Sequence, residues 1–190
     1  MPMIRETILT TTGPTGAVHL APVGLIADGE EWIIAPFRPS TTLDNLRGVP
    51  YAVANYTDDV RIFAGCLTGR HQWPTVESDR IPVQRLAGAL AHAELAVDRI
   101  TEDKERPRFH CRVLHVATHA AFQGFNRAQA AVIEAAILVS RIEMLPREKV
   151  EKEIAYLQIA VGKTAGTAEQ QAWQWLMESI SARHAGQSRP

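Results

Sequence analysis

The sequence has little of several features that mark particular classes of protein. Its 190 residues include only two cysteines, and acidic and basic residues nearly balance to a formal net charge of −1. No apolar run approaches the length of about 20 residues that a membrane-spanning helix needs, and the first residues lack the apolar stretch of a signal peptide. We therefore expect a cytoplasmic protein that binds neither nucleic acid nor membrane.

The two cysteines, Cys66 and Cys111, are not spaced as a redox or zinc-binding motif. Both stand in apolar or strand-like surroundings, where a thiol packs as a small hydrophobic side chain. We expect them to be structural and not joined by a disulfide.

The composition that is present belongs to an ordinary globular protein, with 46% hydrophobic and 22% charged residues. In the first part of the chain, short runs rich in β-branched and aromatic residues alternate with turn-forming residues. These runs predict strands at residues 4–12, 17–27, 32–36, 51–55 and 60–63. A short helix capped by hydroxyl side chains is expected at 41–46.

Residues 90–100 fit two kinds of secondary structure. Their alanines favour a helix, whereas the alternation of apolar and polar residues favours a strand. We predict a strand that pairs with 108–119 through the charged tip between them.

Helical periodicity dominates the last third of the chain. Asn126 is the predicted N-cap of a helix that is apolar around nearly its whole circumference and must therefore be buried. Pro146 is expected in the first turn of a second helix that ends at Gly162. A capping box of Thr167 and Gln170 is expected to start a third helix.

The strongest local motif precedes the predicted helix at 41–46. Backbone N–H groups at a helix start, hydroxyl side chains and a cation together bind a phosphate group, and Arg38, Ser40, Thr41 and Thr42 supply them. Alternatively, the hydroxyls only cap the helix and Arg38 pairs with a surface acid. The spacing leaves both interpretations open.

Two further segments could contact a ligand. Pro22 marks the strand that contains His19 as an edge or an irregular point, where a flat ring can approach. The simpler interpretation is a strand end protected from aggregation, with a solvated histidine. Asn55 and Thr57 close another predicted strand, where such side chains either bind a ligand or form an Asx turn.

Other motifs predict no site. His110, His115 and His119 lie on one predicted strand, and no acidic residue or cysteine is spaced to complete a metal site, so we expect none. Gly162 and the lysine after it do not form a P-loop, because Leu157 stands where that motif requires glycine.

The motifs G-x-x-H-L-A-P, P-F-R-x-S-T-T-x-x-N-L and V-A-N occur in the order seen in flavin reductase-like split barrels. The chain is similar to an uncharacterised family of FMN-binding split-barrel proteins with a helical C-terminal part. That similarity also includes E-T-I-L-T-T, T-D-D-V and F-N-R-A-Q-A-A-V-I-E-A-A-I-L-V-S-R, and it spans nearly the whole chain.

The resemblance implies an α+β fold, with an antiparallel split β-barrel at 1–122 and a three-helix subdomain at 123–190 that packs on the barrel or at a dimer interface. It implies a homodimeric FMN-dependent oxidoreductase, with flavin near the subunit boundary. A nicotinamide nucleotide or a small molecule would be its substrate, with a link to pterin-dependent one-carbon metabolism. The alternatives are a non-catalytic FMN carrier, store or sensor, or a dimeric scaffold without flavin.

The resemblance also implies which residues touch FMN. The phosphate would be bound by Arg38, Ser40, Thr41 and Thr42. The ring and the ribityl chain would lie along Thr10, His19, Leu20, Ala21, Pro22 and Asn55. The other expected cofactor-binding residues are Phe37, Asn45 and Thr57. His19 stands where the reductases usually have asparagine, and an imidazole there can tune the flavin or relay a proton.

Overall fold

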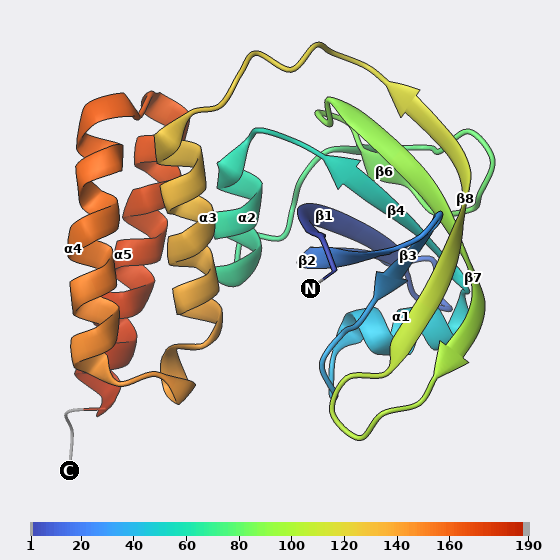
Figure 1. Cartoon of the computed structure of the whole chain (residues 1–190), viewed down its shortest axis with the longest axis horizontal. Helices are drawn as coiled ribbons and strands as arrows, with labels where there is room; N and C mark the ends of the chain where they lie inside the picture. The colour runs from blue at the N-terminus through green and yellow to red at the C-terminus, as the bar shows by residue number, and fades with distance from the viewer. Residues whose placement is uncertain (1, 188–190) are drawn as a thin grey trace. The chain divides into compact units, whose positions relative to one another are not determined.

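The computed structural model describes residues 2–187 and divides into two compact units (Figure 1). One unit contains the chain up to residue 57 together with residues 72–122, and the other contains residues 58–71 together with the chain from residue 123. The helical unit is therefore built from two separate stretches of sequence. The last residues of the expected helical subdomain, 188–190, lie outside the described residues.

The first unit is a closed antiparallel barrel with the strand order β1-β2-β3-β8-β7-β4 (Figure 1). Its strands are β1 (Ile4–Thr12), β2 (Val18–Asp28), β3 (Glu31–Ile34), β4 (Tyr51–Tyr56), β7 (Ala91–Thr101) and β8 (Arg108–Thr118). The same unit contains helix α1 (Thr41–Gly48) and a two-stranded sheet of β5 (Thr75–Val76) and β6 (Arg85–Leu86). Barrel and helices together confirm the predicted α+β fold class.

Alternation along the strands decides which side chains fill the barrel. Leu9, Leu95 and Phe109 are buried in its core, and α1 adds Leu43 and Leu46. Successive side chains of a strand point to opposite faces, so residues adjacent to core residues point away from the barrel interior. The alanine-rich segment, which fitted both a helix and a strand, forms the strand β7 as predicted.

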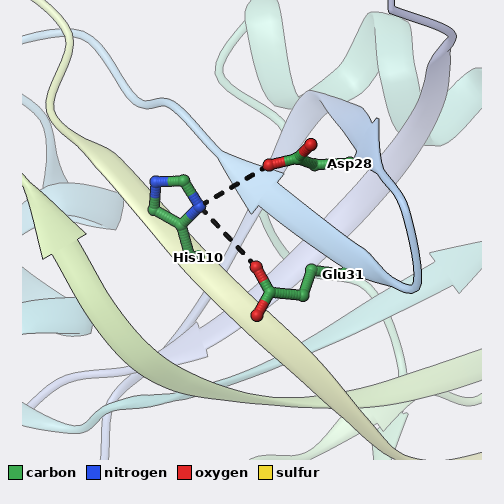
Figure 2. Close-up of side chains that lie close together, drawn as sticks. All are labelled: Asp28, Glu31 and His110. Carbon is green, nitrogen blue, oxygen red and sulfur yellow. Dashed lines mark ion pairs between the residues drawn. The ribbon is translucent and has the colours of Figure 1, made fainter.

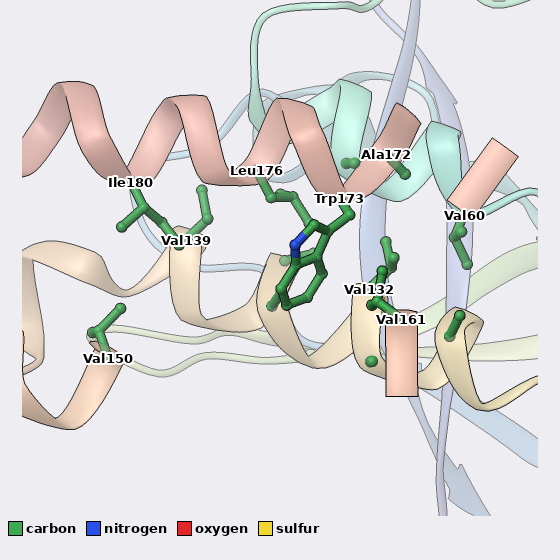
Figure 3. Close-up of a cluster of buried hydrophobic side chains, with 14 of the residues drawn as sticks. Val60, Val132, Val139, Val150, Val161, Ala172, Trp173, Leu176 and Ile180 are labelled. Carbon is green, nitrogen blue, oxygen red and sulfur yellow. The ribbon is translucent and has the colours of Figure 1, made fainter. Parts of the chain in front are cut away.

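The second unit consists of α2 (Val60–Leu67), α3 (Arg127–Ser140), the 3-10 helix η1 (Ile142–Met144), α4 (Arg147–Thr164) and α5 (Thr167–Gln187). Side chains from these helices form one buried apolar cluster, which includes Val60, Val132, Trp173 and Leu176 (Figure 3). Asn126 caps α3 as predicted, since its side chain accepts a hydrogen bond from the Ala128 N–H. Within the described residues, no helix is both long and apolar enough to span a bilayer.

The strand predicted at 60–63 is wrong, because these residues form the first turn of α2. A run of four residues, three of them apolar, is too short to distinguish the period of a strand from that of a helix. The decisive local signal is Asp59, whose carboxylate accepts a hydrogen bond from the Arg61 N–H (3.1 Å) and caps the helix.

Two predicted helix ends are also wrong. Helix α4 continues beyond Gly162 to Thr164, and Gly162 does not take the positive φ with which glycine ends a helix. The capping box of α5 lies one residue earlier than expected, because the N–H of Gly166 donates to the Glu169 carboxylate (2.9 Å).

Candidate functional site

The predicted phosphate-binding segment is the loop that leads into α1. Ser40 is the N-cap of this helix: its hydroxyl accepts a hydrogen bond from the Leu43 N–H (3.3 Å), and its carbonyl accepts one from the Asp44 N–H (3.2 Å). Thr41 is exposed at the first helical position, whereas Thr42 is buried. Ser40 therefore serves the helix, and Thr41 is the hydroxyl that faces solvent.

Two arginines share one carboxylate beside this loop. Arg38 contacts Glu102 at 3.1 Å, and Arg47 contacts both oxygens of the same carboxylate at 2.6 and 2.9 Å. All three side chains are substantially exposed, with 39%, 41% and 59% of their surface accessible for Arg38, Arg47 and Glu102. Glu102 is thus the surface acid of the alternative interpretation. Two guanidinium groups against one carboxylate still leave an excess of one positive charge.

The tip between β7 and β8 holds the loop in place. The Arg38 N–H donates to the Glu105 carbonyl (2.9 Å). Arg106 donates two hydrogen bonds to the Ala35 carbonyl (3.1 and 2.8 Å), and its guanidinium lies 4.3 Å from the centre of the Phe37 ring. Phe37 is consequently a partner of Arg106, although 56% of its surface remains exposed.

The predicted ring-binding residues of β1 and β2 do not share one face. Thr10 lies opposite Leu20, and Ala21 lies opposite the core residue Leu9. Alternation therefore places His19 and Ala21 on the inner side of β2, and Leu20 and Pro22 on the outer side with Thr10. A ring along the outer side would meet only the second set of side chains.

Asn55 is fully buried and engaged within the protein. Its amide nitrogen donates to the Ile8 carbonyl (2.9 Å) and the Thr10 hydroxyl (2.8 Å), and its amide oxygen accepts the Leu86 N–H (2.8 Å). These bonds connect β4 to β1 and β6. The polar side chain at the end of the strand was recognised from the sequence, but its partners come from distant segments.

Asn45 and Thr57 occupy different places in this unit. Asn45 is buried in α1 and donates to the Thr11 hydroxyl (3.0 Å), so it fastens the helix to β1. Thr57 is half-buried and follows the end of β4. Since Thr11 lies opposite His19, Asn45 and His19 both approach this end of the β1–β2 pair.

Thr12 is a candidate that the sequence interpretation missed. Its hydroxyl is buried and has no hydrogen-bond partner among the described residues. Alternation puts Thr12 on the same outer side as Thr10. The period of two within the run Thr10-Thr11-Thr12 is the signal that could have identified it.

Two histidines of β8 have acidic partners, contrary to the expectation from spacing. His110 lies 4.0 Å from Asp28 and 3.8 Å from Glu31 (Figure 2). His115 lies 3.2 Å from Asp79. The carboxylates come from other segments of the barrel unit, so distances along the sequence could not reveal them.

His119, the third histidine of this segment, titrates below its usual range. Loss of solvent around its ring lowers the pKa of His119, and the nearby charge of Arg85 lowers it further, with a smaller opposing effect of Asp79. Its Nε2 lies 2.9 Å from Nδ1 of His92. Since the neutral form is favoured, this ring is suited to accept or share a proton with His92.

The strand order defines the fold class of this protein: it is an α+β protein with a closed antiparallel barrel. It is similar in fold to the 2-nitrobenzoate 2-nitroreductase NbaA of Pseudomonas fluorescens, with a TM-score of 0.52 and 18% identity over 63% of this chain and 66% of that chain. A comparable match is the styrene monooxygenase flavin reductase SMOB of Pseudomonas putida S12, with a TM-score of 0.51 and 15% identity over 60% of this chain and 81% of that chain.

The chain belongs to the DUF447 family. The model described as "Protein of unknown function (DUF447) N-terminal domain" matches residues 5–120, and the model "Protein of unknown function (DUF447)" matches residues 126–178. The FMN-bound protein MM1853 of Methanosarcina mazei has the same fold, with a TM-score of 0.83 and 20% identity over 94% of this chain and 96% of that chain. No curated protein matches the sequence.

Proposed function

We propose that this protein is a cytoplasmic FMN-binding oxidoreductase that acts on a small molecule. The observation that carries the proposal is the similarity along 94% of the chain to a protein whose structure contains FMN. The flavin reductase and the nitroreductase with the same barrel support redox chemistry as the use of the flavin.

The start of α1 fits a phosphate group. Thr41 offers an exposed hydroxyl at the helix N-terminus, where unpaired N–H groups and the helix dipole favour an anion. Arg38 and Arg47 bring two positive charges, and their shared partner Glu102 is exposed. Because exposed ion pairs contribute little stability, a phosphate can displace Glu102 from one guanidinium at low cost.

The outer side of β1 and β2 fits the ring and the ribityl chain. On this side Pro22 is half-buried and keeps some apolar surface, whereas Leu20 is only 6% exposed. The hydroxyl of Thr12, which has no hydrogen-bond partner among the described residues, is a group that a polar ligand could satisfy. Bound FMN would supply the electron-accepting group, and the chain's residues would hold and orient it. His19, on the opposite side of β2, would reach the ligand only at the strand's end.

The substrate side of the proposal depends on the family resemblance described in the sequence analysis. A nicotinamide nucleotide is the expected electron donor, and pterins are the first acceptors to test, given the family resemblance. We further propose a homodimer with flavin near the subunit boundary.

Flavin titration of the purified protein tests the proposal. Flavin-free protein should quench FMN fluorescence with one site per chain. Removing the charge-assisted bonds of Arg38 in Arg38→Ala should weaken binding by about 10- to 100-fold, as expected for roughly 1.5 to 3 kcal/mol. The control is Arg147→Ala, which removes an exposed arginine paired with Glu151 in the helical unit. Protein that takes up no FMN would refute the function, and unchanged affinity in Arg38→Ala would refute only the phosphate site.

Anaerobic reduction separates an oxidoreductase from a carrier. Addition of NADH or NADPH to the FMN-loaded protein should bleach the flavin absorbance near its visible maximum. A spectrum that neither nucleotide changes would contradict direct reduction by nicotinamide.

A further inference from the structure

Three histidines and two carboxylates meet on the outer side of the barrel. His92 and Glu94 lie two residues apart on β7 and therefore share a face, and the register pairs Glu94 with His115 of β8. His119 follows β8, and Asp79 lies between β5 and β6. We call these five residues the histidine–carboxylate cluster. It lies away from the barrel core, to which Ala93 and Leu95 contribute.

The distances within the cluster match those between ligands of one metal ion. His115 Nε2 lies 3.2 Å from Asp79 Oδ2, and His92 Nε2 lies 3.3 Å from Glu94 Oε1 and 3.7 Å from Asp79 Oδ2. The ligand atoms of Asp79, Glu94 and His115 all lie within 4.8 Å of one another. Tetrahedral ligands at zinc distances are about 3.3 Å apart. His92 is not part of this mutually close group, so its ring must move toward His115 to become a fourth ligand.

Burial and charge favour a cation here. Glu94 is completely buried, and its two oxygens accept the N–H groups of Asp79 (2.7 Å) and Arg80 (2.9 Å), which fix the carboxylate in place. Among the ion pairs of the described residues, the carboxylates of Glu94 and Asp79 pair with histidines and with no lysine or arginine. The side chain of Asp79 is 55% exposed, so an ion has a path from solvent.

His119 is positioned as an outer partner of His92. The two rings are stacked with an interplanar angle of 3°, and His92 Nδ1 lies 2.9 Å from His119 Nε2. A histidine that binds a metal through one ring nitrogen usually donates the N–H of the other to a nearby acceptor, which fixes its tautomer. His119 provides such an acceptor.

The other group of one histidine and two acids lacks this character. Arg99 donates to both oxygens of Glu31 (3.0 and 2.8 Å), and its guanidinium lies 2.8 Å from His110 Nδ1. The hydroxyl of Thr101 lies 3.2 Å from the second ring nitrogen of His110. A resident guanidinium thus already pairs with one of the two carboxylates of this group, whose other acid is Asp28, and it contacts the histidine as well (Figure 2). The group of Asp28, Glu31 and His110 therefore serves as the control for metal binding by the histidine–carboxylate cluster.

We propose that the histidine–carboxylate cluster binds a divalent transition-metal ion such as Zn²⁺. Asp79, Glu94 and His115 supply three ligands, and His92 supplies the fourth. Imidazole and carboxylate ligands at these spacings suit zinc and its neighbours in the first transition row. None of the four ligands belongs to the loop before α1 that is proposed to hold the FMN phosphate, and the tests use flavin-free protein.

Calorimetric titration of chelator-treated, flavin-free full-length protein with Zn²⁺ tests the proposal. The unaltered protein should bind one ion per chain. Asp79→Asn and His115→Gln should each weaken binding at least tenfold, and His119→Gln should weaken it by about tenfold, as expected for loss of an outer partner. His110→Gln, in the control group, should bind as the unaltered protein does.

A second measurement needs no variant. Co²⁺ added to the unaltered protein should give the visible absorption bands of a four-coordinate site, and Zn²⁺ should abolish them. The proposal would be overturned if the protein took up no ion, or took up several ions weakly without these bands. It would also be overturned if Asp79→Asn and His115→Gln bound Zn²⁺ as tightly as the unaltered protein does. Far-UV circular dichroism identifies any variant that fails to fold. For such a variant, the Co²⁺ spectrum of the unaltered protein tests the proposal instead.

Discussion

Replacement of Asn55 by alanine tests the hydrogen-bonding role of a residue that the family resemblance assigns to the ligand. The change removes three bonds to other segments, with the Ile8 carbonyl, the Thr10 hydroxyl and the Leu86 N–H, and a longer one to the Val53 carbonyl of the same strand (3.3 Å). The groups lose this hydrogen-bond partner at a place where Asn55 itself is fully buried. We therefore expect loss of stability in the absence of any flavin.

The size of the effect follows from the three partners. A buried hydrogen bond contributes about 1 kcal/mol, and a buried donor left without a partner costs about 1 to 3 kcal/mol. The Thr10 hydroxyl can rotate, whereas the Leu86 N–H cannot. The expected destabilisation is about 3 to 5 kcal/mol, a large part of the roughly 5 to 15 kcal/mol that stabilises a typical domain. Asn45→Ala, which removes one bond to Thr11, should cost about 1 kcal/mol.

Hydrogen exchange followed by mass spectrometry is the appropriate assay, because the chain has two compact units and a single unfolding curve would mix them. Peptides from β1, β4 and β6 should exchange much faster in flavin-free Asn55→Ala than in Asn45→Ala, while α3 and α5 should exchange as before. Equal protection in the two variants would refute the reasoning. Reduced FMN affinity with unchanged protection would instead show that Asn55 serves the ligand.

Two further predictions concern the thiols and a helix cap. Burial raises the pKa of Cys66 to about 11 and that of Cys111, with added effects of Asp98 and Glu31, to about 12. At pH 8, about one in a thousand or fewer of these cysteine side chains is therefore a thiolate. Iodoacetamide should label both cysteines far more slowly in the native protein than in urea-unfolded protein. Rapid labelling of Cys111 in the native protein would contradict its burial. Asn126→Ala removes the cap of α3 and the hydrogen bond to the Thr164 carbonyl. It should destabilise the helical unit by about 1 to 2 kcal/mol, measured by urea unfolding. Asn126→Ser should recover part of this loss, because serine also caps helices.

Local patterns predicted most of the barrel. The first hairpin and the pair β7–β8 follow from alternation and turn residues, and the start of α3 follows from its cap. Helix α2 could not be predicted from the short run at 60–63, because Val60 is buried in a cluster with residues of α3 and α5, far along the chain. Tertiary packing, which the local sequence does not contain, decided this segment.

The same distinction applies to the candidate sites. The loop before α1 is contiguous, so its residues could be listed from the sequence. Which of His19 and Leu20 faces outward depends on strand register, and these partners of Asn55 come from two distant segments, β1 and β6. Asp79 and His115 are brought together only by the closed sheet. Spacing along the sequence could not predict contacts between residues that are so far apart in the chain.

The position of α2 in the chain affects how the protein can be made and divided. This helix leaves the ribosome long before α3, α4 and α5, yet Val60 and Ala64 are buried in the same cluster as those later helices. A chain cut after residue 122 would keep α2 but lose the surfaces that cover it, and would expose an apolar helix to aggregation. The barrel therefore cannot be separated cleanly by truncation at a single point, and a shortened version must also replace residues 58–71 with a polar linker.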